Sequence, residues 1–332
     1  MMTTHSGRLH LILFAMGCSA LASCKEMLPD TTAARVVVME GATPRLTATL
    51  VSGASATYTT LVTNAGGGTL PIHSVTWASS DQGVATVSQS GVVTGVRSGQ
   101  ASITANVGDL VSPALVVTVT PGAAAKLAVR TQPAGAAAAL PLSSQPVIEV
   151  QDAAGNLVSS NVVVTATIAT GQGTITNSTA TATAGVAAFS GLTLTGLVGD
   201  RTLTFSAPGL ASVTSSGLAL NPGVASQLVI RAQPLGAISG LPLLGQPVVD
   251  IRDVAGNVVT GFAGTVIATV ATGSGTLLGA TVNAAGGVAT FTKLAVAGPP
   301  TTLSLSFTTF GIPTVTSQSF TVAASALGLR RR

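Results

Sequence analysis

Apolar and polar residues alternate along most of this chain with a period of two, the pattern of β-strands that bury one face. The segment Leu203-Thr204-Phe205-Ser206 shows it, because every second side chain is apolar. Gly and Pro interrupt the alternation at regular intervals, and the residues between them are rich in Val, Thr and Ile. Short strands folded into closed sandwiches have this composition. The sequence therefore predicts an all-β protein.

One short sequence motif occurs twice and predicts a tandem of domains. Leu127–Pro133 and Leu228–Pro234 share an order of apolar residues, Arg, Gln and Pro, and their Gln residues are 101 positions apart. Two further motifs recur at the same offset, Gln145–Val147 as Gln246–Val248 and Asp152–Asn156 as Asp253–Asn257. This offset is about the length of one β-sandwich domain. We expect sandwich domains at residues 122–221 and 223–323.

Each repeat has a strand pattern followed by a turn pattern. The alternation predicts apolar side chains facing inward at Ile148, Val150, Val249 and Ile251, and acidic side chains facing water at Glu149 and Asp250. The Asp-x-Ala-Gly-Asn motif that follows consists of residues that tolerate left-handed backbone and cap turns with their own side chains. It predicts a tight hairpin in both repeats.

A Pro-Gly dipeptide precedes each repeat, at Pro121-Gly122 and Pro222-Gly223. Proline fixes φ and removes a donor, whereas glycine lets the chain turn. Such short joints leave little slack. We therefore expect consecutive domains to be held in a limited range of orientations, as an extended array.

Another set of motifs precedes the repeats. Val36–Val38 and Leu46–Leu50 have strand patterns, and they are followed by Val75–Asp81, Val84–Val87, Gly91–Val96 and Gly99–Ala105. Among these, Ala85, Val87 and Val92 predict a hairpin with one apolar face. The order of motifs over residues 35–120 resembles the bacterial Ig-like domain of group 2. This resemblance implies a small β-sandwich with Trp77 in the core, Gly91 and Gly95 in turns, and Gly99 ahead of a late strand.

The two repeats also resemble a known class of domain. A strand, Asp-x-x-Gly-Asn and then Gly-x-Ala-x-Phe, found at Gly185–Phe189 and Gly287–Phe291, is similar to the Ig-like repeats of invasin and intimin type adhesins. The resemblance implies a stalk or adhesive rod outside the cell. No binding residues carry over, because those adhesins place recognition in a distal domain.

The N-terminus has the layout of a secretory signal peptide. Arg8 precedes an apolar run, Leu11–Met16, and small residues lead to a cysteine. Leu21, Ala22, Ser23 and Cys24 resemble the lipobox of bacterial lipoproteins. The resemblance implies a signal peptide at residues 1–23, an acylated Cys24 as the first mature residue, and a tether at residues 24–34. Membrane lipid is then the partner that anchors the chain.

Two neighbouring residues refine this prediction. Cys18 lacks a Leu at the first position of such a box, so we expect it to be discarded with the leader. Lys25 stands where lipoproteins of enterobacterial type carry an Asp as their inner-membrane retention signal, which favours the outer membrane. The alternative is an ordinary signal peptide that is cut after a small residue and leaves Cys24 as a free thiol.

Composition limits the remaining classes of protein. The 332 residues are 46% hydrophobic and only 7% charged, with a mean hydropathy of +0.62. Past the leader, no apolar run approaches the ~18 residues of a membrane-spanning helix. The formal net charge of +4 comes largely from Arg8 and from Arg330, Arg331 and Arg332 in a basic tail at residues 324–332. The domains hold no cluster of cations, so we expect no nucleic-acid partner.

Candidate chemistry is sparse. His73 is the only histidine after the leader, which leaves no His cluster for zinc and no Cys/His pair, and it lacks a Gly-x-Ser-x-Gly elbow nearby. Glu149 with Asp152, or Asp250 with Asp253, could supply oxygens to Ca²⁺, but that ion takes six to eight, so a solvated edge and a turn cap are favoured. Trp77 could be a sugar-stacking platform, yet its strand pattern favours the core. We expect no metal, cofactor or catalytic residue.

Two functions fit these observations. The first is a non-catalytic, lipid-anchored cell-envelope protein that displays Ig-like domains for adhesion or structural contact with a protein or glycan. The second is a carbohydrate-binding or assembly module of an extracytoplasmic enzyme system. The low aromatic content, 3%, counts against sugar recognition.

Overall fold

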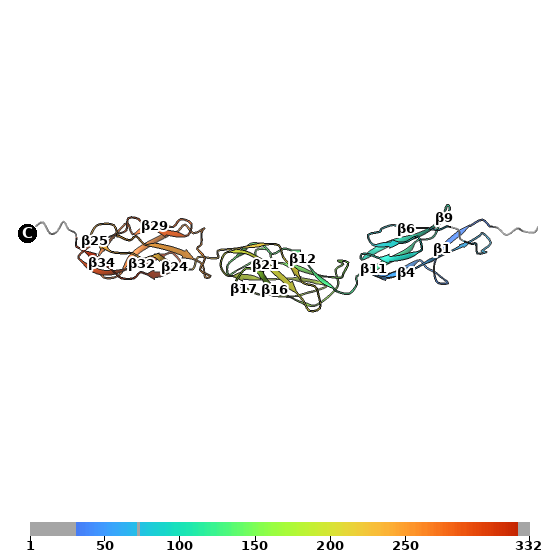
Figure 1. Cartoon of the computed structure of the whole chain (residues 1–332), viewed down its shortest axis with the longest axis horizontal. Helices are drawn as coiled ribbons and strands as arrows, with labels where there is room; N and C mark the ends of the chain where they lie inside the picture. Colours follow the sequence, from blue (N-terminus) through green and yellow to red (C-terminus); the bar gives the residue numbers. More distant parts are fainter. Residues whose placement is uncertain (1–30, 72–73, 325–332) are drawn as a thin grey trace, which may run out of the picture. The chain divides into compact units, whose positions relative to one another are not determined.

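The computed structural model describes residues 31–71 and 74–324, and within these ranges the chain forms β-strands and no α-helix (Figure 1). The prediction of an all-β fold is therefore confirmed. No helix in the described ranges could span a membrane. The leader, the lipobox, Cys24, His73 and residues 325–332 of the tail lie outside the described residues.

The chain divides into two compact units. Of the described residues, the first contains those up to Ala48, together with those in Ser55–Val93 and Gln100–Val117. The second contains Thr49–Ala54, Thr94–Gly99 and the chain from Thr118 onward. Two short segments of the predicted first domain thus belong with the repeats that follow it.

The first unit is built around a valine-rich strand. In β1 (Arg35–Glu40), Val36 and Val38 are almost fully buried. β1 pairs antiparallel with β2 (Thr43–Pro44) and β5 (Thr59–Thr63). β9 (Gly99–Val107) pairs antiparallel with β6 (Thr76–Ser79) and β10 (Leu110–Val111) (Figure 1). This unit also holds β4 (Ser55–Thr57) and β7 (Ala85–Val87). Three further strands have residues in both units: β3 (Thr47–Val51), β8 (Val92–Gly95) and β11 (Leu115–Thr120).

The hairpin predicted from Ala85, Val87 and Val92 forms, but its apolar face differs. Ser88 N donates to Val92 O at 2.9 Å, and Ala85 is fully buried. Val93, not Val92, is the second fully buried residue. Because side chains alternate along a strand, this is a shift of one position.

The glycines that the resemblance singled out have different roles. Gly91 has φ +80° and turns the chain, as implied. Gly99 is the first residue of β9, also as implied. Gly95 was expected in a turn but is the last residue of β8. A Cβ there would lie 3.0 Å from Val119 Cγ1 and 3.2 Å from Val51 O, so close packing is its reason to be glycine.

The middle repeat, residues 122–221, has its own core. One sheet runs β12-β15-β19, a second runs β13-β23-β21-β16-β18 with β22 on β21, and a third runs β14-β20-β17. The bounds are β12 (Lys126–Thr131), β13 (Ala136–Ala137), β14 (Leu140–Pro141), β15 (Val147–Gln151), β16 (Val163–Thr170), β17 (Thr174–Thr176), β18 (Thr179–Thr181), β19 (Val186–Ala188), β20 (Thr193–Thr195), β21 (Gly199–Ser206), β22 (Val213–Thr214) and β23 (Leu218–Asn221).

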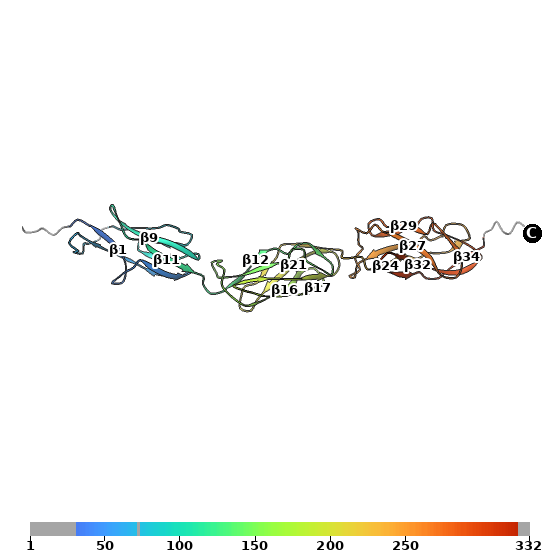
Figure 2. The same ribbon diagram turned by 180° about the vertical axis from the view of Figure 1, so that it is seen from behind.

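The C-terminal repeat, residues 223–323, repeats this topology around a separate core. Its sheets run β24-β26-β30, β25-β34-β32-β27-β29 with β33 on β32, and β28-β31. Figure 2 shows β27 and β32 side by side. The bounds are β24 (Gln227–Ala232), β25 (Ala237–Ile238), β26 (Val248–Arg252), β27 (Thr265–Thr272), β28 (Thr276–Leu278), β29 (Thr281–Asn283), β30 (Val288–Thr290), β31 (Ala295–Ala297), β32 (Thr301–Thr309), β33 (Ile312–Thr316) and β34 (Phe320–Ala323).

Equivalent packing in the two repeats explains their common motifs. The Phe of Gly-x-Ala-x-Phe is buried in both, with Phe189 against Phe205 and Phe291 against Phe307, each pair at 5.5 Å between ring centroids. The ladders of β12 with β15 and of β24 with β26 shift register at the same place, next to Thr131 and Ala232. Such bulges fix strand register, so one pattern of buried side chains serves both sandwiches.

The inward side chains predicted for β15 and β26 are confirmed, but one predicted outward side chain is not. Ile148, Val150, Val249 and Ile251 are fully buried. The side chain of Asp250, expected to face water, is only 1% exposed. It is paired with Arg252 at 2.8 Å and with Arg231 at 3.5 Å. These two guanidinium groups offset the cost of removing the carboxylate from water. Its counterpart Glu149 remains partly exposed.

Candidate functional site

Asp152, the first residue of the repeated turn motif, is a buried carboxylate surrounded by donors. It is 2% exposed. Its Oδ2 accepts hydrogen bonds from Gly122 N at 2.8 Å and Asn156 Nδ2 at 2.7 Å, and its Oδ1 accepts one from Asn156 N at 2.8 Å. Gly122 belongs to the Pro-Gly dipeptide that precedes the repeat. The carboxylate therefore connects that dipeptide to the hairpin.

Asn156 extends this cluster to a more distant part of the chain. Its Oδ1 accepts a hydrogen bond from Ser98 N at 2.9 Å and from Ser98 Oγ at 3.2 Å. Ser98 precedes β9 and lies 58 positions earlier, and both residues belong to the second compact unit. We call Asp152, Asn156, Gly122 and Ser98 the first Asp–Asn clamp.

The next repeat builds the same arrangement. Asp253, 0% exposed, accepts hydrogen bonds from Gly223 N at 2.8 Å, from Asn257 N and Nδ2 at 2.9 Å each, and from Ala255 N at 2.9 Å. Asn257 then accepts from Val198 N and donates to Gly196 O, each at 2.9 Å. Asp253, Asn257, Gly223, Val198 and Gly196 form the second Asp–Asn clamp. Each clamp thus joins the start of a repeat to a loop that precedes the Asn of the clamp by roughly sixty residues.

Hydrogen bonding keeps the clamp carboxylates ionised. Burial by itself raises the pKa of Asp152, but the Asn156 amide and the backbone N–H groups of Gly122, Asn156 and Gly155 outweigh it and lower the pKa to about 2. The pKa of Asp253 is lowered for the same reasons. A buried carboxylate with this many donors is stabilised as the anion. The clamps are therefore charged at neutral pH.

The carboxylates considered as calcium ligands make contacts within the protein. The oxygens of Asp152 and Asp253 already accept hydrogen bonds from the protein, and Asp250 is paired with arginines. Within residues 31–71 and 74–324, no group of three or more His, Cys, Asp or Glu side chains could hold a metal ion. The Asp-x-Ala-Gly-Asn turn forms as predicted, with Gly155 N donating to Asp152 O at 3.1 Å.

The Gln-Pro-Val motif supplies a second structural device. Gln145 donates through Nε2 to Leu142 O at 2.9 Å and accepts through Oε1 from Leu192 N at 2.9 Å. Gln246 makes the equivalent bonds with Leu243 and Leu294. These amides hold a loop against a strand that lies almost fifty residues away. The repeated Gln-Pro-Val motif therefore has a structural role in the fold.

Other predicted residues fall into two groups. Trp77 is 6% exposed, so it belongs to the core and is no sugar platform. Leu21, Ala22, Ser23, Cys24 and His73 lie outside the described residues.

Sequence reasoning missed one exposed aromatic residue, Phe310, which is 100% exposed at the tip of the β32–β33 hairpin. The equivalent position of the middle repeat is Pro208, since β21 and β32 match at an offset of 102 residues. Comparison of the two repeats position by position would have singled it out, because an aromatic ring there is not needed for the fold.

The comparisons with known proteins agree with the domain type. Residues 30–119 match the family model described as bacterial Ig-like domain (group 2), which confirms the resemblance seen in the sequence. A comparison with curated proteins found no match.

Among solved structures, the chain is similar to the Escherichia coli adhesin FdeC, with 17% identity over 88% of this chain and 96% of that one and a TM-score of 0.37. It is similar to the D00-D0 domain of intimin, with 12% identity over 56% and 98% and a TM-score of 0.34. It is also similar to domains 4-9 of the surface layer protein SbsC, with 17% identity over 89% and 48% and a TM-score of 0.25.

Proposed function

We propose that this chain is a non-catalytic, lipid-anchored protein of the bacterial cell envelope, and that it displays tandem Ig-like domains for adhesion or structural contact. The anchor is an acylated Cys24, and the outer membrane is its location. The partner contacted by the displayed domains is a protein or a glycan.

The observation that supports this proposal most strongly is the repetition of the Asp–Asn clamp. Both clamps use a buried carboxylate to connect the Pro-Gly dipeptide at the start of a repeat with an earlier loop. Their polar groups are engaged in hydrogen bonds within the second compact unit, which favours a structural role for the repeats over catalysis. Repeats stabilised in this way suit a protein whose purpose is to display its surface.

The leader supports the anchor. Leu21, Ala22 and Ser23 precede Cys24 in the order that the lipid-modifying and cleaving enzymes of bacteria read. Two or more acyl chains, at ~0.8 kcal/mol per buried methylene, hold a protein to a bilayer far more firmly than one.

The test compares Cys24→Ala with Cys18→Ala, a matched control within the same leader. We expect wild type and Cys18→Ala in the membrane fraction and Cys24→Ala in the soluble exported fraction. Protease added to intact cells should degrade the anchored forms if the domains face outward. Retention of Cys24→Ala in the membrane fraction would contradict the lipid anchor.

The alternative, a carbohydrate-binding or assembly module of an extracytoplasmic enzyme system, has no sugar-binding surface at Trp77. Trp77 is buried against Gly91, so it offers no face to a sugar. A glycan contact has to involve another part of the molecule.

A further inference from the structure

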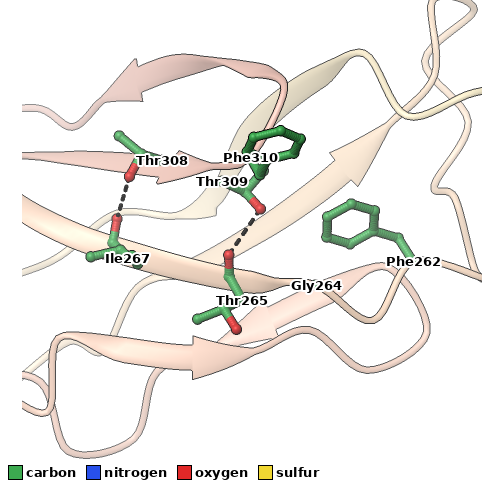
Figure 3. A pocket seen from close by; sticks show the side chains of 7 residues that line it. All are labelled: Phe262, Gly264, Thr265, Ile267, Thr308, Thr309 and Phe310. Atoms are coloured by element: carbon green, nitrogen blue, oxygen red, sulfur yellow. Dashed lines mark hydrogen bonds between the residues drawn. The ribbon is translucent and has the colours of Figure 1, made fainter.

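A surface hollow of about 550 Å³ lies at one end of β27 and β32 in the C-terminal repeat (Figure 3). Two aromatic rings flank it. Phe310 is fully exposed, and Phe262 is half-buried. Beside the rings, Thr265, Thr308 and Thr309 also line the hollow with hydroxyl-bearing side chains, and Ile267 contributes an exposed apolar surface. The volume lies in the range of small-molecule sites.

Phe262 packs against the core of its repeat, but the equivalent sandwich of the middle repeat forms without either ring. Gly287 N donates to Phe262 O at 3.1 Å, and in the middle repeat Gly185 N donates to Ser160 O at 3.1 Å, so Ser160 is the counterpart of Phe262. Pro208 is the counterpart of Phe310, and both are followed by a glycine with φ near +75°. The same fold thus forms with Ser and Pro at these positions. The Phe310 ring, left entirely in water at a hairpin tip, makes no packing contribution and is accessible to a ligand.

The chain also makes room for the half-buried ring. A Cβ added to Gly264 would lie 2.7 Å from Phe262 Cζ and 2.9 Å from its Cε1, so the ring rests against the glycine backbone. This contact holds Phe262 at the rim of the hollow, as Figure 3 shows. The position of one of the two rings is therefore built into the local backbone.

The hydroxyl groups define what a ligand must offer. Thr309 Oγ1 donates to Thr265 O at 2.8 Å, Thr308 Oγ1 donates to Ile267 O at 3.5 Å, and Thr265 Oγ1 donates to Asn283 Oδ1 at 2.7 Å. Each threonine has used its only proton and keeps lone pairs that can accept. A ligand that fits here brings hydrogen-bond donors of its own together with an apolar face for the rings.

The charge of the ligand follows from the lining. None of the described residues that line the hollow is charged. An anionic or cationic ligand would lose hydration there without gaining a counter-charge. A saccharide ring without charged groups combines donating hydroxyls with an apolar C–H face, and C–H faces stack on aromatic rings.

From these features we propose that the hollow between Phe262 and Phe310 binds a neutral saccharide. This proposal rests on the proposed display function and names the class of ligand that the displayed domains would bind. A second copy of this chain, docking through the exposed ring, is the competing occupant.

The test measures binding of the purified full-length chain to neutral hexose and N-acetylhexosamine oligosaccharides, with uronic acid oligomers as the charged comparison. Isothermal titration calorimetry should detect binding of at least one neutral oligosaccharide and no binding of uronic acid oligomers. The affinity of Phe310→Ala for the neutral oligosaccharide should be at least about tenfold weaker than that of wild type. Leu244→Ala, which removes another exposed apolar side chain of the same repeat (78% exposed), should bind like wild type. Gly264→Ala, which displaces the Phe262 ring, should weaken binding while the unfolding transition is retained.

Three results would overturn the site: no neutral oligosaccharide bound, equal affinity of wild type and Phe310→Ala, or binding confined to charged oligomers. Sedimentation that shows a dimer abolished by Phe310→Ala would assign the surface to a second copy instead. The assay uses purified protein, so its failure leaves the anchoring test untouched. Loss of anchoring in Cys24→Ala would in turn leave saccharide binding unchanged.

Discussion

Asp253 Oδ2 and Asn257 Nδ2 lie 2.9 Å apart, and Asp152 and Asn156 repeat the pair at 2.7 Å. In each pair, the carboxylate binds the backbone at the start of its repeat, and the amide binds a loop far earlier in the chain. A motif that reads as a turn in the sequence therefore also holds the start of each repeat to an earlier loop.

Removal of a clamp carboxylate should destabilise the protein strongly. In Asp253→Ala, the N–H groups of Gly223, Ala255 and Asn257 lose their acceptor. We expect a loss of about 2–5 kcal/mol in the free energy of unfolding, because buried donors are left unpaired. Urea denaturation measures it. Asp200→Ala, at an exposed position, is the control and should change stability by no more than about 0.5 kcal/mol.

Acid should weaken the clamps in a defined pH window. The folded pKa of Asp152 is lowered from 3.8 to about 2, so its contribution to stability is complete above about pH 4 and is lost as the pH falls toward 2. Asp253 shifts in the same direction. The double variant Asp152→Asn/Asp253→Asn should show a flatter decline of unfolding free energy between pH 4 and pH 2 than wild type. Asp109→Asn, at an exposed turn, should keep the wild-type slope, and equal slopes for all three proteins would refute the assignment.

Alanine variants of two phenylalanines, one buried and one exposed, should distinguish a role in packing from a role in recognition. Phe205 is fully buried against Phe189, so Phe205→Ala should cost about 3–5 kcal/mol of stability. Phe310 is fully exposed, so Phe310→Ala should change stability by less than about 0.5 kcal/mol. Thermal unfolding of both variants checks this difference. A large loss in Phe310→Ala would mean that the ring serves the fold.

Two glycines with positive φ should respond unequally to alanine. Gly41, with φ +60°, has open space where a Cβ would point, so Gly41→Ala should cost about 1 kcal/mol from backbone strain alone. Gly91, with φ +80°, would direct a Cβ into Tyr58 O, and Trp77 Cζ2 would be only 3.1 Å away. Gly91→Ala should therefore cost at least about 3 kcal/mol. Denaturant midpoints of the two variants give the comparison, and equal losses would contradict it.

Local patterns predicted the strands and turns because period-two alternation and the Asp-x-Ala-Gly-Asn motif act over a few residues. They could not predict the clamps, since Ser98 lies 58 positions before Asn156 and Val198 lies 59 before Asn257. The burial of Asp250 depends on Arg231 in another strand, which alternation within β26 does not reveal.

The exposed ring of Phe310 was overlooked for a different reason. A single Phe in an alternating segment indicates core, and only the match with Pro208 shows that this position lies beyond the strand, at the hairpin tip. The aromatic content of the whole chain gives the number of rings but not where in the fold they lie. The proposed saccharide site takes its two rings from this one hollow.

The mass of the N-terminal peptide of the mature protein tests the lipid anchor, and with it the display function, most directly. Protein purified from membranes should begin at Cys24 and carry a mass increment equal to a diacylglyceryl group plus an amide-linked acyl chain. A mature chain that begins at any other residue, or an unmodified thiol at Cys24, would contradict the account.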